Sequence, residues 1–209
     1  CSNASNSSNI SCSNDNSNKI SLSESNNLPE FPFEIRDTYD NIFKEDRMPG
    51  ASMYMGADPF VYRFNGVYYL YVTCAGKTLY AWKSEDLIHW YEIGNVINVT
   101  KEAHTGPWAP EIMYLNEKFY LITSFSGKGH VMLSSDSPEG PFVPINNEPI
   151  DSGKIDGGFF IDKDEQVYCL MAGMTIRKFN NDMTGYSSSE IAYQNAKVAG
   201  WNEGPQITL

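Results

Sequence analysis

Short apolar runs rich in aromatic and β-branched residues, each ended by Gly, Asn, Asp or Pro, dominate the chain after residue 50. Such runs are typical of β-strands, and no long amphipathic helix is expected in this region. Asn65-Gly66 separates the first two runs and predicts a type I′ hairpin turn, because both residues accept a positive φ. The first group of expected strands covers 60–64, 67–73, 79–84 and 90–93.

This group of strands recurs along the chain. The second group is expected at 112–115, 118–123 and 131–134, and the third at 159–162, 167–172 and 176–179. A carboxylate precedes or opens each first strand, roughly every fifty residues, which is the period of propeller blades. We therefore predict an all-β chain in which matching positions of successive blades bring four acids towards one axis. These acids are Asp58, Glu111, Asp156 and Glu203.

A fourth group begins at 201–205 and reaches only one strand before Leu209. A propeller covers its blade faces only when the ring closes, so we expect a fragment with three complete blades and the first strand of a fourth. Residues 1–28 are mostly Ser and Asn, which predicts a flexible tether. Residues 29–50 are expected to lead into the propeller domain, which takes up 51–209.

The composition and charge of the chain limit the classes of partner that it can bind. A net charge of −11 and a pI near 4.6 argue against nucleic acid and anionic membranes. A neutral carbohydrate is compatible with this charge, and we expect a monomer. Cys1 followed by Ser2 resembles the start of a mature bacterial lipoprotein, so a secreted or cell-surface location is expected, with membrane attachment only through lipid on Cys1. Cys74 and Cys169 lie in apolar runs and are expected to be buried and unpaired.

Four carboxylates on one axis suit the hydrolysis of a glycosidic bond. That reaction needs one carboxylic acid to protonate the leaving oxygen and one carboxylate to activate water or attack carbon. Crowding raises the pKa of the most desolvated carboxyl, which keeps it protonated near neutral pH. The alternative is that each acid only bonds backbone N–H groups of its turn. Four acids at blade spacing favour a shared site.

Several motifs in fixed order resemble glycoside hydrolase family 43. They are Ala57-Asp58-Pro59-Phe60, Trp108-Ala109-Pro110-Glu111, Ser134 to Phe142, Ile155-Asp156 and Glu203-Gly204-Pro205. The resemblance covers about residue 50 to the end. It implies a five-bladed β-propeller that cleaves arabinose- or xylose-containing plant polysaccharides or oligosaccharides with inversion of configuration.

The resemblance also implies roles for individual residues. Asp58 matches the general base, Glu203 the general acid, and Asp156 the residue that tunes the pKa of the acid and orients substrate. In an inverting enzyme the acid and base stand roughly 6.5–9.5 Å apart, which we expect for Glu203 and Asp58. Gly157 follows Asp156 where the family usually has Pro, and we expect this to loosen the backbone. The expected substrate-binding residues are Glu111, Trp108 and Phe159.

No cofactor is expected to be required. Calcium on the propeller axis occurs in the family, but the sequence offers no ligand set for it, and the lone loop residue His104 is expected to be solvated. Two other functions stay open. One is a non-catalytic, glycan-binding propeller. The other is a retaining fructoside hydrolase, which would want Arg-Asp-Pro in a middle blade, whereas Arg36-Asp37 is followed by Thr38. The 209 residues alone need not be active, because further blades complete the pocket walls.

Overall fold

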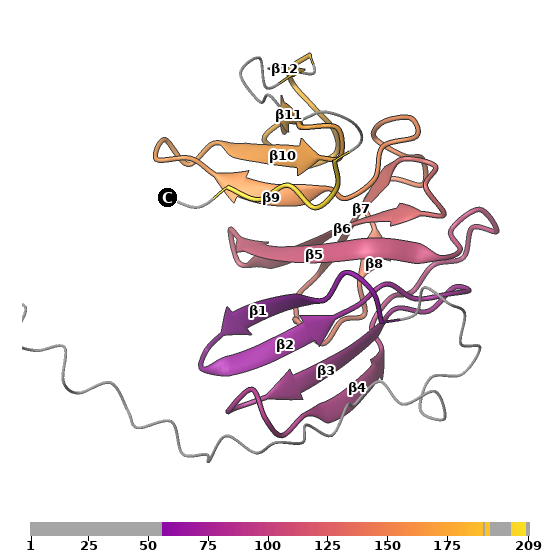
Figure 1. Ribbon diagram of the computed structural model, residues 1–209, viewed down its shortest axis with the longest axis vertical. Coiled ribbons are helices and arrows are strands. Elements are labelled where there is room, and N and C mark those ends of the chain that lie inside the picture. Colours follow the sequence, from indigo (N-terminus) through magenta and orange to yellow (C-terminus); the bar gives the residue numbers. More distant parts are fainter. Residues whose placement is uncertain (1–55, 190, 193–201, 208–209) are drawn as a thin grey trace, which may run out of the picture. The chain divides into compact units, whose positions relative to one another are not determined.

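The computed structural model describes residues 56–189, 191–192 and 202–207, which belong to one structural unit (Figure 1). The expected tether at 1–28, the lead-in segment at 29–50 and Cys1 lie outside the described residues. The described part contains no helix, and therefore none that is long and apolar enough to cross a membrane. The all-β prediction is confirmed.

Twelve strands in the described residues form three antiparallel sheets of four strands, with neighbours hydrogen-bonded in chain order (Figure 1). The first sheet contains β1 (Phe60–Phe64), β2 (Val67–Tyr71), β3 (Tyr80–Ser84) and β4 (Tyr91–Asn95). The second contains β5 (Pro107–Leu115), β6 (Lys118–Phe125), β7 (His130–Ser135) and β8 (Val143–Pro144). The third contains β9 (Gly158–Ile161), β10 (Val167–Met171), β11 (Thr175–Lys178) and β12 (Ile191–Ala192).

The first hairpin follows the sequence prediction. Asn65 and Gly66 have φ values of 48° and 86°, as a type I′ turn requires, and β1 pairs with β2 around them in unbroken register. The second sheet differs from expectation at its start. β5 begins at Pro107, so that the Trp108–Glu111 motif lies inside the strand, and its register shifts between these two residues. A bulge of this kind changes the direction of the side chains that follow it.

The sheets are blades whose inner strands neighbour one another. β5 lies beside both β1 and β9 (Figure 1). The backbone N–H of Tyr114 in β5 donates to the hydroxyl of Tyr62 in β1 at 3.1 Å, and the N–H of Cys74 after β2 donates to the carbonyl of Pro107 at 3.0 Å. These bonds fix the start of each blade against its neighbour.

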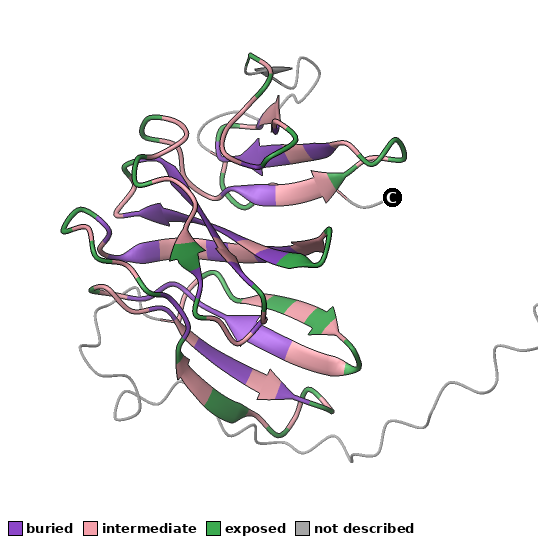
Figure 2. Cartoon of the chain, turned by 180° about the vertical axis from the view of Figure 1, so that it is seen from behind, coloured by how far each residue is buried: buried purple, intermediate pink, exposed green. Residues whose placement is uncertain are grey.

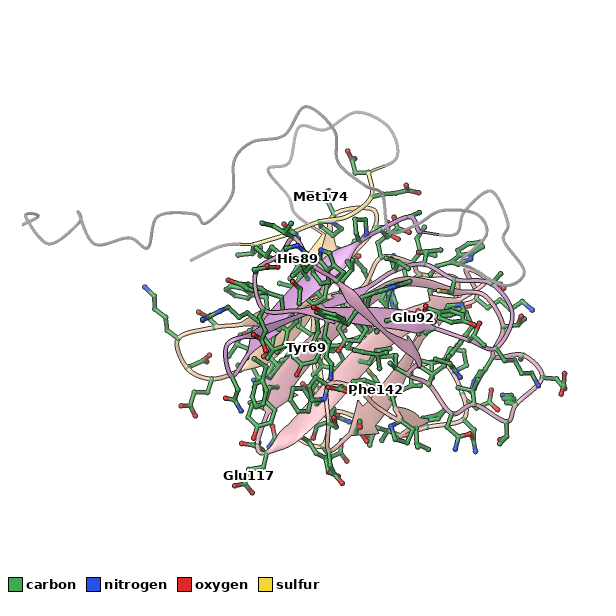
Figure 3. All side chains as sticks on the ribbon, turned by 90° about the horizontal axis from the view of Figure 1, so that it is seen from below. Tyr69, His89, Glu92, Glu117, Phe142 and Met174 are labelled. Carbon is green, nitrogen blue, oxygen red and sulfur yellow. The ribbon has the colours of Figure 1, made fainter. Side chains whose placement is uncertain are left out.

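Buried residues are concentrated in the strands of the three sheets (Figure 2). Tyr71 and Phe119 belong to a cluster shared by the first two blades, and Phe142 packs edge-on against Tyr71. Figure 3 shows Phe142 among other side chains, whereas Glu117 at the β5–β6 turn points away from the sheets. Each such large side chain contributes roughly 1.5–3 kcal/mol when fully buried.

Two expectations about single residues have opposite outcomes. Cys74 and Cys169 are buried and unpaired, as predicted. His104 is not solvated as expected: it is only 2% exposed, because its ring stacks on Phe125 at a centroid distance of 4.7 Å and its Nε2 lies 3.2 Å from the carbonyl oxygen of Asn147. A sequence cannot reveal that an aromatic residue 21 positions away covers a loop histidine.

Candidate active site

Four carboxylates line one pocket of about 340 Å³. Asp58 precedes β1, Glu111 lies in β5, Asp156 precedes β9, and Glu203 belongs to the segment 202–207. The pocket is therefore built by the starts of three blades and by a separate segment that follows them. Asp58 and Glu203 are exposed, whereas Glu111 and Asp156 are half-buried. The structure thus brings together acids that are widely separated along the chain.

A residue with positive φ occurs at the same place in each of these starts. The N–H of Thr73 donates to the carbonyl of Ala57, and the N–H of Ala172 donates in the same way to the carbonyl of Ile155. Pairing of Trp108 with Ser124 places the second blade in the same register. The left-handed residues are Asp58 (φ 50°), Ala109 (44°), Asp156 (54°) and Gly204 (58°). The chain turns at these residues, and the residues around each turn line the pocket.

The four acids do not occupy matching places, which corrects the sequence prediction. Asp58 and Asp156 are themselves the left-handed residues, Glu203 comes one position earlier, and Glu111 comes two positions later. Asp adopts this conformation readily, whereas Ala109 does so at a steric cost. The shared signal in the sequence is the Pro or Gly that follows the left-handed residue at 59, 110, 157 and 205.

Asp58 is held by a residue of its own blade. Its Oδ2 accepts a hydrogen bond of 2.5 Å from the hydroxyl of Thr73, which follows β2. The same hydroxyl oxygen accepts the N–H of Ala109 at 2.8 Å. Thr73 therefore links the carboxylate of the first blade to the start of the second.

Asp156 is half-buried and lines the same pocket as the other three acids. Burial is the largest cause that raises the pKa of Asp156, and the charges of Glu203 and Asp58 raise it further. The N–H of Gly204 donates to Oδ2 of Asp156 at 3.2 Å and acts in the opposite direction. This bond ties Asp156 to the residue next to Glu203.

Glu111 is an acid whose pKa is strongly raised. Its Oε1 accepts the N–H of Phe159 at 2.6 Å, which connects the second blade to the third. Burial raises the pKa of Glu111 to about 7, although the Phe159 bond opposes this shift. Gly158 makes room for the side chain, because a Cβ there would lie 2.9 Å from Oε2 of Glu111.

This carboxyl makes the stability of the complete protein depend on pH. Because the pKa of Glu111 is about 7 in the folded chain and ordinarily 4.5, folding is favoured by the bound proton. This contribution is complete below pH 4.5 and is lost as the pH rises through 7. Glu111→Gln keeps the acceptor for Phe159 but cannot ionise. Between about pH 5 and pH 8 its free energy of unfolding should therefore fall by about 2–3 kcal/mol less than that of the native protein.

Denaturant titrations of both proteins at the two pH values measure this difference. Glu117→Gln, which neutralises an exposed acid at the far end of β5, is the matched control and should leave the pH dependence unchanged. Identical pH dependence in Glu111→Gln and native protein would contradict a proton held at Glu111.

A buried polar cluster that the sequence did not reveal lies against Gly157, the residue after Asp156. Nδ1 of His130 lies 2.7 Å from Oδ2 of Asp151, and the Tyr186 hydroxyl donates to the same oxygen at 3.0 Å. Burial raises the pKa of Asp151, but the bonds from His130 outweigh it and hold the pKa below its usual range. Nε2 of His130 has no hydrogen-bond partner in the described part of the chain. A Cβ on Gly157 would lie only 2.7 Å from this atom. Gly157 therefore has a packing role beside Asp156.

The two aromatic residues expected to bind substrate do not line the pocket of the four acids. Trp108 lies against Gly127 and Gly106. The ring of Phe159 packs at a tilt of 36° against that of Phe179, with a centroid distance of 5.8 Å. Phe159 also lines an adjoining, mostly apolar hollow of about 370 Å³ between β1, β5 and β9. Their part in substrate binding stays a prediction.

The described residues contain no group of three or more His, Cys, Asp or Glu that could hold a metal ion. The expectation that no cofactor is required stays a prediction, as does calcium on the propeller axis.

Comparison with known proteins identifies the family. The family described as glycosyl hydrolases family 43 matches residues 52–208. The chain belongs to this family. The three blades and the segment 202–207 are accordingly parts of its five-bladed β-propeller.

Relatives of this family 43 chain include enzymes named for several sugars. An α-L-arabinofuranosidase from Clostridium thermocellum ATCC 27405 is 28% identical and matches 64% of this chain and 54% of its own, with a TM-score of 0.56. An endo-1,4-β-xylanase from Bacteroides thetaiotaomicron VPI-5482 is 33% identical and matches 64% and 50%, with a TM-score of 0.57. The β-D-galactofuranosidase xynD of Aspergillus niger is 25% identical over 178 residues, 71% of this chain and 52% of that protein. The chain thus spans about half the length of these relatives.

Proposed function

We propose that the protein is an inverting glycoside hydrolase that cleaves arabinose- or xylose-containing plant polysaccharides or oligosaccharides. The observation that carries this proposal is that Asp58, Asp156 and Glu203, from separate segments, line one pocket. Family membership supports glycosidase chemistry, and the named activities of the arabinofuranosidase and the xylanase support the sugar class.

In this mechanism Asp58 is the general base. Its carboxylate removes a proton from the water that attacks the anomeric carbon, while Glu203 donates a proton to the departing oxygen from the opposite face of the sugar. Asp156 lies beside both, and its hydrogen bond to Gly204 places it next to the acid.

A glycan-binding propeller without catalysis is the second candidate, and a retaining fructoside hydrolase is a third. Acids at all three positions favour catalysis over binding alone, since loss of any one carboxylate would suffice to end turnover. The fructoside reading draws no support from the family match.

Assays of the complete protein on aryl glycosides test the proposal. Release of the aryl alcohol from the α-L-arabinofuranoside or the β-D-xyloside is expected. The aryl β-D-galactofuranoside belongs in the same panel because of the galactofuranosidase relative. Binding of arabinan or xylan without turnover of any glycoside would overturn the enzymatic proposal in favour of the binding propeller.

A further inference from the structure

Thr73 occupies a fixed place between the first two blades. Its side chain is buried, with 3% of the residue exposed. Its N–H donates to the carbonyl of Ala57 at 2.9 Å, and its carbonyl accepts the N–H of Gly56 at 3.0 Å. The backbone is thereby tied to both residues that precede Asp58. The hydroxyl is therefore carried by a backbone that is fixed next to the carboxylate.

The direction of the Thr73 hydrogen bonds follows from counting protons. A threonine hydroxyl has one proton to donate and lone pairs to accept with. The N–H of Ala109 donates to Oγ1, so the hydroxyl proton is left for Oδ2 of Asp58. A bond donated to a carboxylate stabilises its charged form and is stronger than a bond between neutral groups.

The surroundings of Asp58 make this donor important. The other titratable groups that line the pocket are Glu111 from β5, Asp156 before β9, and Glu203 from the segment 202–207. All three are acids, and an ionised carboxylate can only accept hydrogen bonds, so in that form none of them can take the place of the Thr73 donor. Among the described residues, Thr73 supplies the side-chain donor to Asp58.

We propose that Thr73 is a positioning residue for the reaction: its hydroxyl holds Oδ2 of Asp58, so that Oδ1 is the oxygen that meets the attacking water. The inference rests on the proposed function, since it concerns the base of that mechanism. Thr73 acts through Asp58 and does not itself touch the reacting atoms.

The same hydroxyl sets the start of the second blade. Ala109 has a φ of 44°, a conformation that costs an alanine free energy, and its N–H is bound by Thr73. Pro110 and Glu111 follow at once. Thr73 therefore places two walls of the pocket relative to each other, which a donor bonded to Asp58 alone could not do.

Thr73→Val in the complete protein tests the proposal, because valine keeps the shape and removes the hydroxyl. We expect kcat to fall about 10–100-fold with KM changed less than about threefold. Thr73→Ser keeps the hydroxyl and should restore the rate.

Thr78→Val is the matched control, because its hydroxyl donates to the backbone carbonyl of Ala75 rather than to a carboxylate. It should leave kcat unchanged. If Thr73→Val does not fold, Thr73→Cys, whose thiol is a weak donor, carries the same expectation.

Two results would overturn the role of Thr73. The first is a native kcat in Thr73→Val. The second is equal impairment in the valine and serine variants, which would indicate packing alone. Asp58→Asn measured in the same assay separates the two levels of inference: its loss of turnover bears on the proposed function and does not depend on the outcome for Thr73.

Discussion

Asp58→Asn in the complete protein is expected to lower kcat by about 10²–10⁴-fold, the range for losing a general base. Asparagine has nearly the shape of aspartate and can accept the Thr73 bond through its amide oxygen, but it cannot take a proton from water. Binding of sugar should persist, because the pocket keeps its outline. Turnover is measured on the aryl glycoside, and binding by calorimetry with the matching oligosaccharide.

Glu117→Gln is the control for this substitution. It also removes one negative charge from an exposed acid, but at the β5–β6 turn, away from the pocket (Figure 3). Its kcat should equal that of the native protein. Native-like turnover in Asp58→Asn would remove the general base from the mechanism.

Glu203→Gln should have an effect that depends on the leaving group. A sugar leaves poorly without a proton, so kcat on an oligosaccharide is expected to fall about 10²–10⁴-fold. A dinitrophenolate leaves without protonation, so kcat on the dinitrophenyl glycoside should fall less than about tenfold.

Comparing the two substrates within one variant is an internal control for folding. A misfolded or displaced site would lose both activities together. An equal loss on oligosaccharide and dinitrophenyl glycoside would therefore contradict the role of Glu203 as the proton donor.

The strands were predictable where the pattern was long enough. The first three strands of each blade follow from apolar runs, and Asn65-Gly66 gave the correct turn. The outer strands β8 and β12 contain only two residues each, too few to show any period. β8 pairs with β7 and β12 pairs with β11, and an irregular connection separates the two strands of each pair along the chain. This pairing, rather than a local sequence pattern, determines where the short strands lie.

The sequence was sufficient to predict which acids form the site, but not how they are placed relative to the turns that carry them. Spacing grouped Asp58, Asp156 and Glu203, yet it also suggested that Glu111 held the same position, which the bulge in β5 prevents. Ala109 takes the left-handed place in that blade, and alanine gives no hint of positive φ. Only the proline after it marks the turn.

The residues that support the site could not be predicted from the sequence, because their hydrogen-bond partners are far away along the chain. Thr73 is 15 residues from Asp58 and 36 from Ala109. Asp151 is 21 residues from His130 and 35 from Tyr186. Such contacts are made when blades pack together, and hydrogen bonds between distant residues leave no local pattern. The glycines at 157 and 158 have the same origin, since their missing Cβ atoms make room for His130 and Glu111.

The configuration of the first sugar released tests the account most directly. Proton NMR of the complete protein acting on an aryl α-L-arabinofuranoside or β-D-xyloside records that anomer before mutarotation. Water activated by Asp58 and a leaving group protonated by Glu203 predict inversion, so that the arabinofuranoside gives the β-anomer and the xyloside the α-anomer. A product that keeps the configuration of the substrate would contradict the roles assigned to these two residues.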